Sequence, residues 1–356
     1  MRLFRHYTKL PTAVRGSVVA LGNFDGVHLG HQAVIARARE IGRVAARPVG
    51  IMTFEPHPRT VFAEDKDFFR LTSFRTKART IALLGVDFLI TQHFDLNFAR
   101  YTAAEFVDNV LVKGIGVHHV VVGYDYLFGR SRSGNVTTLE TLGKSHGFAV
   151  TAVPPVRSAE GTVYSSTQVR TCLVEGRPRD AAQLLGRYFE LEGRVGYGDQ
   201  WGRGLGYPTA NIHLSAYQKP HTGVYAVRAS VSQKEGMLWR NGVANYGYRP
   251  SFKGRIPLLE VHLLDFAENI YRQNLRVALV EFLRPERLFD GREALRAQIA
   301  ADAAQARTIL STLPLSIPSI PQSHRTISVS EVGGGGSPPL PTPCERALNT
   351  TTLMRS

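Results

Sequence analysis

Two histidines three residues apart are the side chains whose types and spacing first point to chemistry. They end the segment Gly22-Asn-Phe-Asp-Gly-Val-His-Leu-Gly-His31, which follows a short apolar run at 17–21. That order predicts a buried strand, a glycine-bearing turn and the opening turn of a helix. The amino end of a helix offers unpaired N–H groups and a partial positive charge. With Gly30 removing bulk between His28 and His31, the segment predicts a pocket for a polyphosphate.

The same histidines allow two other interpretations. They are consistent with surface residues at a helix start, or with a metal site that includes Asp25. The complete pattern Gly-x-Phe-Asp-x-x-His-x-Gly-His on a strand, turn and helix favours nucleotide binding. In that interpretation the imidazoles of His28 and His31 donate hydrogen bonds to phosphate oxygens where charge grows during transfer of a nucleotidyl group.

A second candidate site lies in the glycine-rich segment 198–211, Gly-Asp-Gln-Trp-Gly-Arg-Gly-Leu-Gly-Tyr-Pro-Thr-Ala-Asn. Its glycines let backbone amides approach a phosphate chain closely. Thr209 and Asn211 are two apart on an extended stretch, so their side chains point the same way. Their oxygens suit Mg²⁺, a hard cation. The alternative is a glycine-rich hairpin with an ordinary Pro-Thr turn.

Glu260 is the acidic residue we expect to work with that segment. In Leu258-Leu-Glu-Val-His-Leu-Leu264 the apolar residues share one face of a strand, and Glu260 and His262 share the other. A carboxylate on a rigid strand can accept the proton of a neutral hydroxyl nucleophile. A solvent-facing Glu-x-His pair on an edge strand is the alternative.

These residues need a scaffold, and the first half of the chain predicts a parallel sheet covered by helices on both faces. Its strands are expected at 18–21, 48–54, 86–91, 118–123 and 148–153. Its helices are expected at 31–44, 74–84, 103–111 and 136–146. Such sheets bind ligands beyond the carboxyl ends of their strands, where the histidine segment falls.

Three more segments follow strands and are therefore expected at the same rim. They are 53–59, 123–134 and 164–170. Ser165, Ser166 or Thr167 can cap the helix that the last of them opens, with Arg170 roughly one turn inside as a second anion clamp. An ordinary cap with a surface arginine is the alternative. Asp125 is either a turn residue or a group that positions a substrate.

The second half has a different pattern. After a helical stretch at 167–185, short alternating strands predict a small antiparallel barrel, with strands at 189–195, 223–231, 237–243, 258–264 and 276–282. An amphipathic helix at 291–310 closes it, with one stripe of Leu295, Ile299, Ala303, Ala306 and Leu310. We expect domains at 1–185 and 186–311. The remainder, 312–356, is rich in Pro, Ser, Thr and Gly and is expected to be disordered.

Composition limits the classes of partner. The net charge of +14 comes from scattered Lys and Arg residues, with no block of five, which argues against nucleic acid as the principal ligand. No apolar run approaches the roughly 20 residues that span a bilayer, so no membrane partner is expected. The two cysteines, Cys172 and Cys344, predict no structural disulfide and a reducing cytoplasm.

The quoted segments resemble the bifunctional bacterial riboflavin kinase/FAD synthetase family from about residue 14 to 310. The histidine segment and the three rim segments resemble its FAD-forming half. The Pro-Thr-Ala-Asn segment, Gly223-Val-Tyr, 242–252 and Glu260 resemble its kinase half. The resemblance implies an α/β nucleotidyltransferase domain with a Rossmann-like parallel sheet, followed by an antiparallel β-barrel riboflavin kinase domain with a C-terminal helix.

The resemblance also implies two reactions. Riboflavin and ATP give FMN, and FMN and ATP give FAD with release of pyrophosphate, with Mg²⁺ accompanying ATP at both sites. It implies Glu260 as the catalytic base of the kinase, Thr209 and Asn211 at Mg·ATP, and Asp125 at the flavin. His28 and His31 are implied as catalytic at the ATP phosphates. The other ATP-binding residues implied are Gly22, Phe24, Asp25, Gly30, Ser165, Ser166, Thr167, Arg170, Gly202, Gly204 and Gly206.

The chain departs from the family pattern at a few positions. Thr76 stands where a glutamate is expected before Lys77, and Tyr126 and Ser251 replace a phenylalanine and a threonine. A proline expected near 186–188 is missing. None of these changes removes a proposed catalytic group.

Two rival functions remain open at this stage. An aminoacyl-tRNA synthetase shares the His-x-Gly-His pattern but needs a lysine-rich second signature and a tRNA-binding domain, which the sequence fits poorly. A catalytically inactive flavin-binding regulator that contacts RNA is consistent with the basic charge, although the intact set of candidate catalytic residues argues against it.

Overall fold

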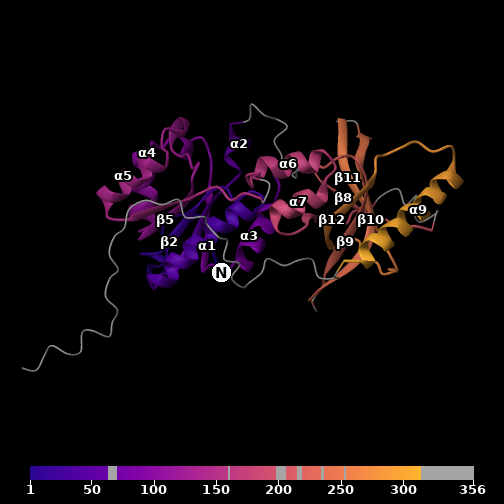
Figure 1. Ribbon diagram of the computed structural model, residues 1–356, viewed down its shortest axis with the longest axis horizontal. Helices are drawn as coiled ribbons and strands as arrows, with labels where there is room; N and C mark the ends of the chain where they lie inside the picture. Colours follow the sequence, from indigo (N-terminus) through magenta and orange to yellow (C-terminus); the bar gives the residue numbers. More distant parts are fainter. Residues whose placement is uncertain are drawn as a thin grey trace, which may run out of the picture. The chain divides into compact units, whose positions relative to one another are not determined.

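The computed structural model shows a parallel sheet followed in the chain by an antiparallel one (Figure 1). The residues that it describes are 1–62, 70–158, 161–197, 206–214, 219–233, 236–251 and 254–313. The tail predicted to be disordered therefore lies outside the described residues from 314 onward, and Cys344 lies there too. Cys172 is buried with a free thiol. No helix of the described residues is both long and apolar enough to cross a membrane.

The first sheet has six parallel strands in the order β1-β4-β3-β2-β5-β6. Its strands are β1 (Arg2–Phe4), β2 (Val18–Leu21), β3 (Val49–Glu55), β4 (Phe88–His93), β5 (His119–Gly123) and β6 (Ala149–Val153). The five predicted strands are confirmed, and β1 is an additional three-residue edge strand. The strand order reverses beside β2, which places a crevice between the carboxyl ends of β2 and β5.

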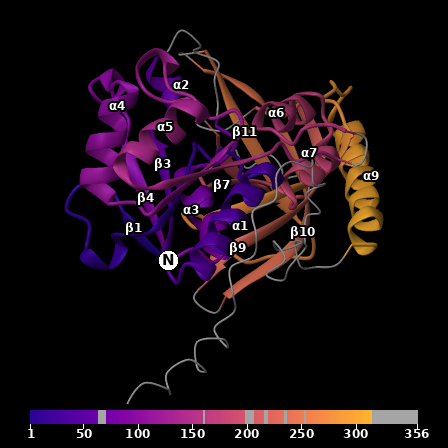
Figure 2. The ribbon, with the colours of Figure 1, turned by 60° about the vertical axis from the view of Figure 1, so that its left-hand side comes forward.

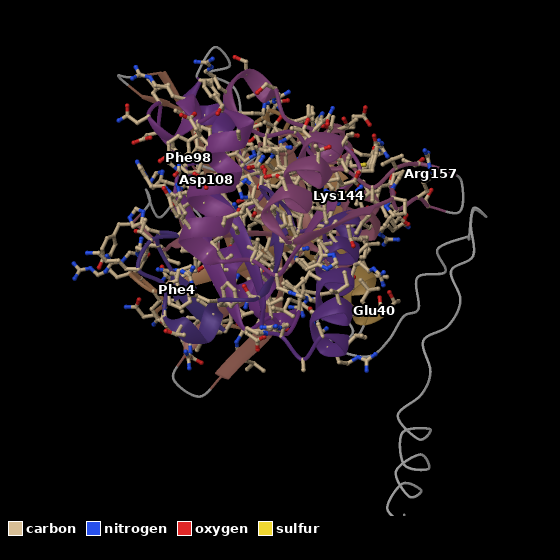
Figure 3. The ribbon with its side chains drawn as sticks, turned by 90° about the vertical axis from the view of Figure 1, so that its left-hand side faces the viewer. Phe4, Glu40, Phe98, Asp108, Lys144 and Arg157 are labelled. Carbon is tan, nitrogen blue, oxygen red and sulfur yellow. The ribbon has the colours of Figure 1, made fainter. Side chains whose placement is uncertain are left out.

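Helices cover both faces of this sheet, as predicted. They are α1 (Leu29–Val44), α2 (Pro58–Val61), α3 (Phe74–Leu83), α4 (Ala103–Glu105) continued by the π-helical segment η3 (Phe106–Ile115), and α5 (Val136–His146). Val18 and Ala20 of β2 pack in one cluster with residues of α1 and α3. Val19 and Leu21 pack in another with residues of η3 and α5. Figure 3 shows charged side chains around this half, with Glu40, Lys144 and Arg157 on its surface.

The stretch predicted as helical at 167–185 is broken into two helices. They are α6 (Ser166–Val174) and α7 (Pro178–Leu185). Gly176 between them has φ +72°, a left-handed conformation that ends a helix. Pro178 has no backbone N–H and therefore cannot extend the hydrogen bonds of α6. It lies in the first turn of α7, where a backbone N–H has no acceptor within the helix.

The second sheet has six antiparallel strands in the order β7-β12-β9-β10-β11-β8. They are β7 (Phe189–Arg194), β8 (Ala210–His213), β9 (Gly223–Gln233), β10 (Gly236–Ser251), β11 (Gly254–Leu263) and β12 (Asn274–Arg284). Gly196, two residues beyond β7, forms an isolated bridge with Asn211 of β8, so the sheet curls into a partly open barrel. The five predicted strands are present, several of them longer than expected, and β8 is additional.

Helix α9 (Arg292–Ser311) lies along the outside of the barrel against β9, β10 and β12 (Figures 1 and 2). Of its predicted stripe, Ala303 is buried, and Ala306 and Leu310 are buried in a cluster with Ala226 and Val280. The helix is also fixed by an ion pair of 2.7 Å between Asp302 and Arg284 of β12.

Candidate active sites

The helix behind the histidine segment begins at Leu29, two residues earlier than predicted. His28 is therefore the N-cap and not a residue of the first turn. Its Nδ1 accepts a hydrogen bond of 3.4 Å from the backbone N–H of His31. A side-chain acceptor at this position satisfies one of the free N–H groups of the helix start. The N–H groups of the first turn that remain without an intrahelical acceptor make this helix start a candidate phosphate site.

The two imidazoles are stacked and uncharged at neutral pH. Their ring centroids are 3.7 Å apart. Burial lowers the pKa of His28 to about 4, and burial together with the neighbouring His28 lowers the pKa of His31 well below its ordinary value. Because Nδ1 of His28 accepts a hydrogen bond, the ring proton lies on Nε2, which is left to donate. Nδ1 of His31 is buried and has no partner among the described residues.

Gly30 and Gly22 are required by close packing and not by backbone conformation. A Cβ on Gly30 would lie 3.0 Å from Cε1 of His28 and 3.0 Å from the carbonyl oxygen of Tyr164. A Cβ on Gly22 would lie 3.2 Å from the ring of Phe24, which is buried with φ +48°. The absence of a side chain at residue 30 therefore lets the start of α1 approach the segment that opens α6.

Asp25 is a buried residue that links its own turn after β2 to α6 and to the segment just before α3. It is 2% exposed, forms an ion pair with Arg170 of α6, and accepts hydrogen bonds of 3.0 and 3.1 Å from the N–H groups of Leu71 and Thr72. Ser166 donates to its backbone carbonyl at 2.9 Å. These contacts use the carboxylate to hold Arg170 in place. The described residues contain no group of three His, Cys, Asp or Glu side chains that could hold a metal, so the metal-site alternative for Asp25 finds no support among them.

The structure brings together most of the predicted residues of the first site. Ser165 caps α6 by accepting a hydrogen bond of 3.2 Å from the N–H of Gln168, and Thr167 is exposed on the first turn. Asp125 is exposed just beyond the carboxyl end of β5. Helix α6 and β5 thus contribute to the same rim as β2, as the parallel topology requires.

Sequence reasoning missed the ion pairs at the end of β3. Glu55 pairs with Lys77 of α3 at 3.0 Å and with Arg70 at 2.7 Å, and the side chain of Lys77 is only 1% exposed. Burial and the charges of Lys77, Arg170 and Arg59 lower the pKa of His57 to about 4, against the opposing effect of Asp25. The segment 53–59 was expected at the rim, but nothing in its composition indicates which cation its glutamate binds.

The second candidate site is a row of polar side chains across three barrel strands. Glu260 of β11 is paired in register with Asn211 of β8 on one side and with Asn245 of β10 on the other. The neighbours of Glu260 in β11, Leu259 and Val261, belong to the barrel core, so the row lies on the opposite face. Asn245 was not singled out from the sequence, because its importance depends on strand register.

The amide oxygens in this row are buried without hydrogen-bond donors. Asn211 is 5% exposed, and its Oδ1 has no partner among the described residues, as is also true of Oδ1 of Asn245. The amide nitrogen of Asn211 donates to the carbonyl of Thr209 at 3.4 Å, and that of Asn245 donates to Glu286 at 3.0 Å. A buried oxygen without a donor is the kind of group that a hard cation satisfies.

A cavity of about 260 Å³ opens beside Thr209. Its walls are largely apolar and include Val195, Val261, Phe266 and Tyr271. The predicted Gly206 is exposed with φ +86°, whereas Gly202 and Gly204 lie outside the described residues.

Both halves of the chain match known protein families. Residues 10–168 match the FAD synthetase family, and residues 185–310 match the riboflavin kinase family. The bifunctional riboflavin kinase/FMN adenylyltransferase of Escherichia coli strain K12 is 41% identical over 309 residues, which span 86% of this chain and 97% of that protein. The protein of the same description from Pseudomonas fluorescens is 41% identical over 91% of this chain and 100% of its own length.

A solved structure of similar fold covers most of the chain. The crystal structure described as a macrolide-efflux protein from Streptococcus pneumoniae is 30% identical, with a TM-score of 0.76 over 86% of this chain and 98% of that one. Both family matches occur in one chain, in the same order as the two sheets. The chain therefore belongs to the bifunctional riboflavin kinase/FMN adenylyltransferase family.

Proposed function

We propose that this chain is one enzyme with two active sites, which converts riboflavin to FMN and FMN to FAD with ATP as the donor in both steps. The proposal is supported by membership of the family together with two separate polar constellations, one on each sheet. We place the division of the domains at 185/186, where α7 ends and Gly186 takes a left-handed conformation with φ +69°. The cytoplasmic location and the absence of a nucleic-acid partner stay predictions.

At the first site, the phosphate of FMN attacks the α-phosphorus of ATP, and pyrophosphate leaves. The attacking phosphate is already an anion at neutral pH, so the reaction needs positioning and charge stabilisation but no general base. His28 and His31 are neutral and serve as hydrogen-bond donors to the phosphates, beside the N–H groups that open α1. Arg170, held by Asp25, supplies positive charge, and Asp125 is proposed to contact the flavin.

At the second site, the terminal hydroxyl of the ribityl chain attacks the γ-phosphorus of ATP, and ADP leaves. A hydroxyl is a weak nucleophile, so we assign Glu260 as the base that takes its proton. Thr209 and Asn211 are proposed to hold Mg²⁺ with ATP, in agreement with the buried, unpartnered Oδ1 of Asn211. Bound Mg²⁺ neutralises charge on the phosphates.

The test is to incubate the purified full-length chain with riboflavin, ATP and Mg²⁺ in the absence of nucleic acid, and then to separate the flavins. We expect FMN to appear first and FAD to follow, and neither to form without ATP. Starting from FMN, FAD and pyrophosphate are expected in equal amounts. A protein that binds flavin but makes neither product is the inactive regulator that the sequence left open.

A further inference from the structure

Helix α3 of the parallel-sheet half and strand β7 of the barrel half are joined by a network of charged side chains. Arg79 of α3 forms ion pairs with Glu192 at 3.0 Å and with Glu190 at 3.3 Å. Thr76, one turn earlier in α3, donates its hydroxyl to Glu192 at 3.3 Å. Both carboxylate side chains are only 8% exposed. Because the contacts are largely shielded from water, they are stronger than a surface ion pair.

The two carboxylates have different roles in the network. Glu190 is also bound inside the barrel by Arg276 of β12, at 2.6 Å. Among the described residues, Glu192 forms no side-chain hydrogen bond or ion pair with another barrel residue. Its partners are Thr76, Arg79 and the more exposed Arg75, all on α3. Glu192 is therefore directed at the other half of the chain.

The turn of α3 that contacts Glu192 also contacts the first active site. Lys77, next to Thr76, forms the buried ion pair of 3.0 Å with Glu55 at the end of β3. Leu71 and Thr72, just before α3, donate their N–H groups to Asp25, which binds Arg170. A shift of this turn would move Lys77 and Arg170, the cations whose charges act on the buried His31 and His28.

We propose that Glu192 of the barrel half is a positioning residue for adenylyl transfer in the other half. Through Thr76 and Arg79 it fixes the start of α3, and thereby the positions of Lys77 and of the Asp25–Arg170 pair. This inference rests on the proposed function of the first site. A small displacement of groups that stabilise a transition state reduces the rate strongly, whereas the kinase site, built on β8, β10 and β11, does not depend on α3.

The first test compares the full-length variants Glu192→Gln and Glu40→Gln. Glu40 forms an exposed ion pair of 2.7 Å with Arg37 on α1 and serves as the matched control. For Glu192→Gln we expect kcat for FMN adenylylation to fall about tenfold, with KM for FMN and the riboflavin kinase rate within about twofold of the parent. The control variant is expected to leave both reactions unchanged.

The second test uses the close approach of Thr76 to Glu192. A Thr76→Glu substitution places a second carboxylate against Glu192, and we expect it to lower adenylylation by about tenfold as well. In the Glu192→Gln background the repulsion is absent, so Thr76→Glu should cause little further loss. A purely local effect of residue 76 would instead lower the rate equally in both backgrounds.

The outcomes separate the inference from the function on which it rests. If the parent chain makes no FAD from FMN, the proposed function is wrong. If the parent makes FAD and Glu192→Gln does so at the same rate, the positioning role is wrong while the function stands. If Glu192→Gln lowers both reactions equally, Glu192 contributes only to the stability of the whole chain, and the inference fails.

Discussion

Glu260 in β11 and Asn211 in β8 are register partners on adjacent antiparallel strands, and the amide oxygen of Asn211 is buried without a hydrogen-bond donor. This pairing places a proton acceptor next to a free oxygen ligand at a spacing fixed by the sheet. The strand ladder, and not a loop, therefore sets the geometry between the proposed base and the proposed metal ligand.

Removing the carboxylate of Glu260 should separate the two reactions. We expect Glu260→Ala to lower riboflavin phosphorylation by at least about a hundredfold, the contribution typical of a general base. FMN adenylylation should continue, because Glu260 contributes no group to the first site. Incubation with riboflavin or with FMN, followed by separation of the flavins, measures each step. The control is Glu293→Gln, a change of an exposed side chain in the first turn of α9. Phosphorylation at the parent rate would show that another group is the base.

Removing the imidazole of His31 should have the opposite effect, so that FAD formation is lost and FMN formation is kept. His31→Ala removes a neutral hydrogen-bond donor from the phosphate pocket, and we expect FAD formation from FMN to fall by about a hundredfold. FMN formation from riboflavin should be unaffected. His146→Ala, at the exposed end of α5, is the matched control. An unchanged rate of pyrophosphate release in His31→Ala would exclude this histidine from the chemistry.

The buried histidines should make the stability of the chain depend on pH. Burial lowers the pKa of His28 and of His57 from 6.5 to about 4 in the folded chain. The unfolded chain therefore binds more protons between these values, so the free energy of unfolding is highest above pH 6.5 and decreases as the pH falls towards 4. For His28 alone the shift corresponds to about 3 kcal/mol.

Urea denaturation at a series of pH values measures this dependence. His28→Asn keeps a side-chain acceptor at the N-cap but removes the titrating imidazole. We expect this variant to lose less stability than the parent between pH 7 and pH 5. An identical pH dependence in the two proteins would contradict the assignment.

The proposed role of Asn211 as a Mg²⁺ ligand can be tested through the Mg²⁺ requirement of the kinase reaction. Asn211→Ala removes the unpartnered oxygen, so the kinase reaction should need a higher Mg²⁺ concentration to reach half its maximal rate. The requirement of the adenylylation reaction in the same preparation should not change, which makes it the internal control. Chelation of Mg²⁺ by EDTA is expected to stop both reactions. Equal Mg²⁺ dependence of the kinase in parent and variant would remove Asn211 from the metal site.

Much of the fold follows from local pattern. The strand at 18–21 is predicted with its bounds, because a central parallel strand is apolar on both faces and is followed here by a glycine-bearing turn. The barrel strands alternate clearly enough to be located, but their ends are set by pairing. β10 extends to Ser251 because β11 pairs with it residue by residue. The edge strand β1 is three residues long and has no periodicity to detect.

The sequence indicated which residue types lie at the two candidate sites, but not which residues they contact. The resemblance implied Asp25 at the nucleotide, and the sequence did not reveal that its carboxylate binds Arg170 and two backbone N–H groups from 46 and 47 residues further on. The helix start was misplaced by two residues because His28, not a Ser, Thr, Asp or Asn residue, caps α1. Thr76 was interpreted as a departure from the family pattern that removes no catalytic group, and only the folded chain shows that it contacts Glu192.

Strand β7 has a practical consequence for anyone who recombines members of this family. Its Glu192 contacts α3, and the bridge at Gly196 just beyond it reaches Asn211. A chimera that joins the first half of this chain to the second half of a relative therefore combines an α3 and a β7 from different proteins, even when the junction falls in the short connection after α7. Exchanging α3 and β7 as a set is the arrangement that should keep such hybrids active.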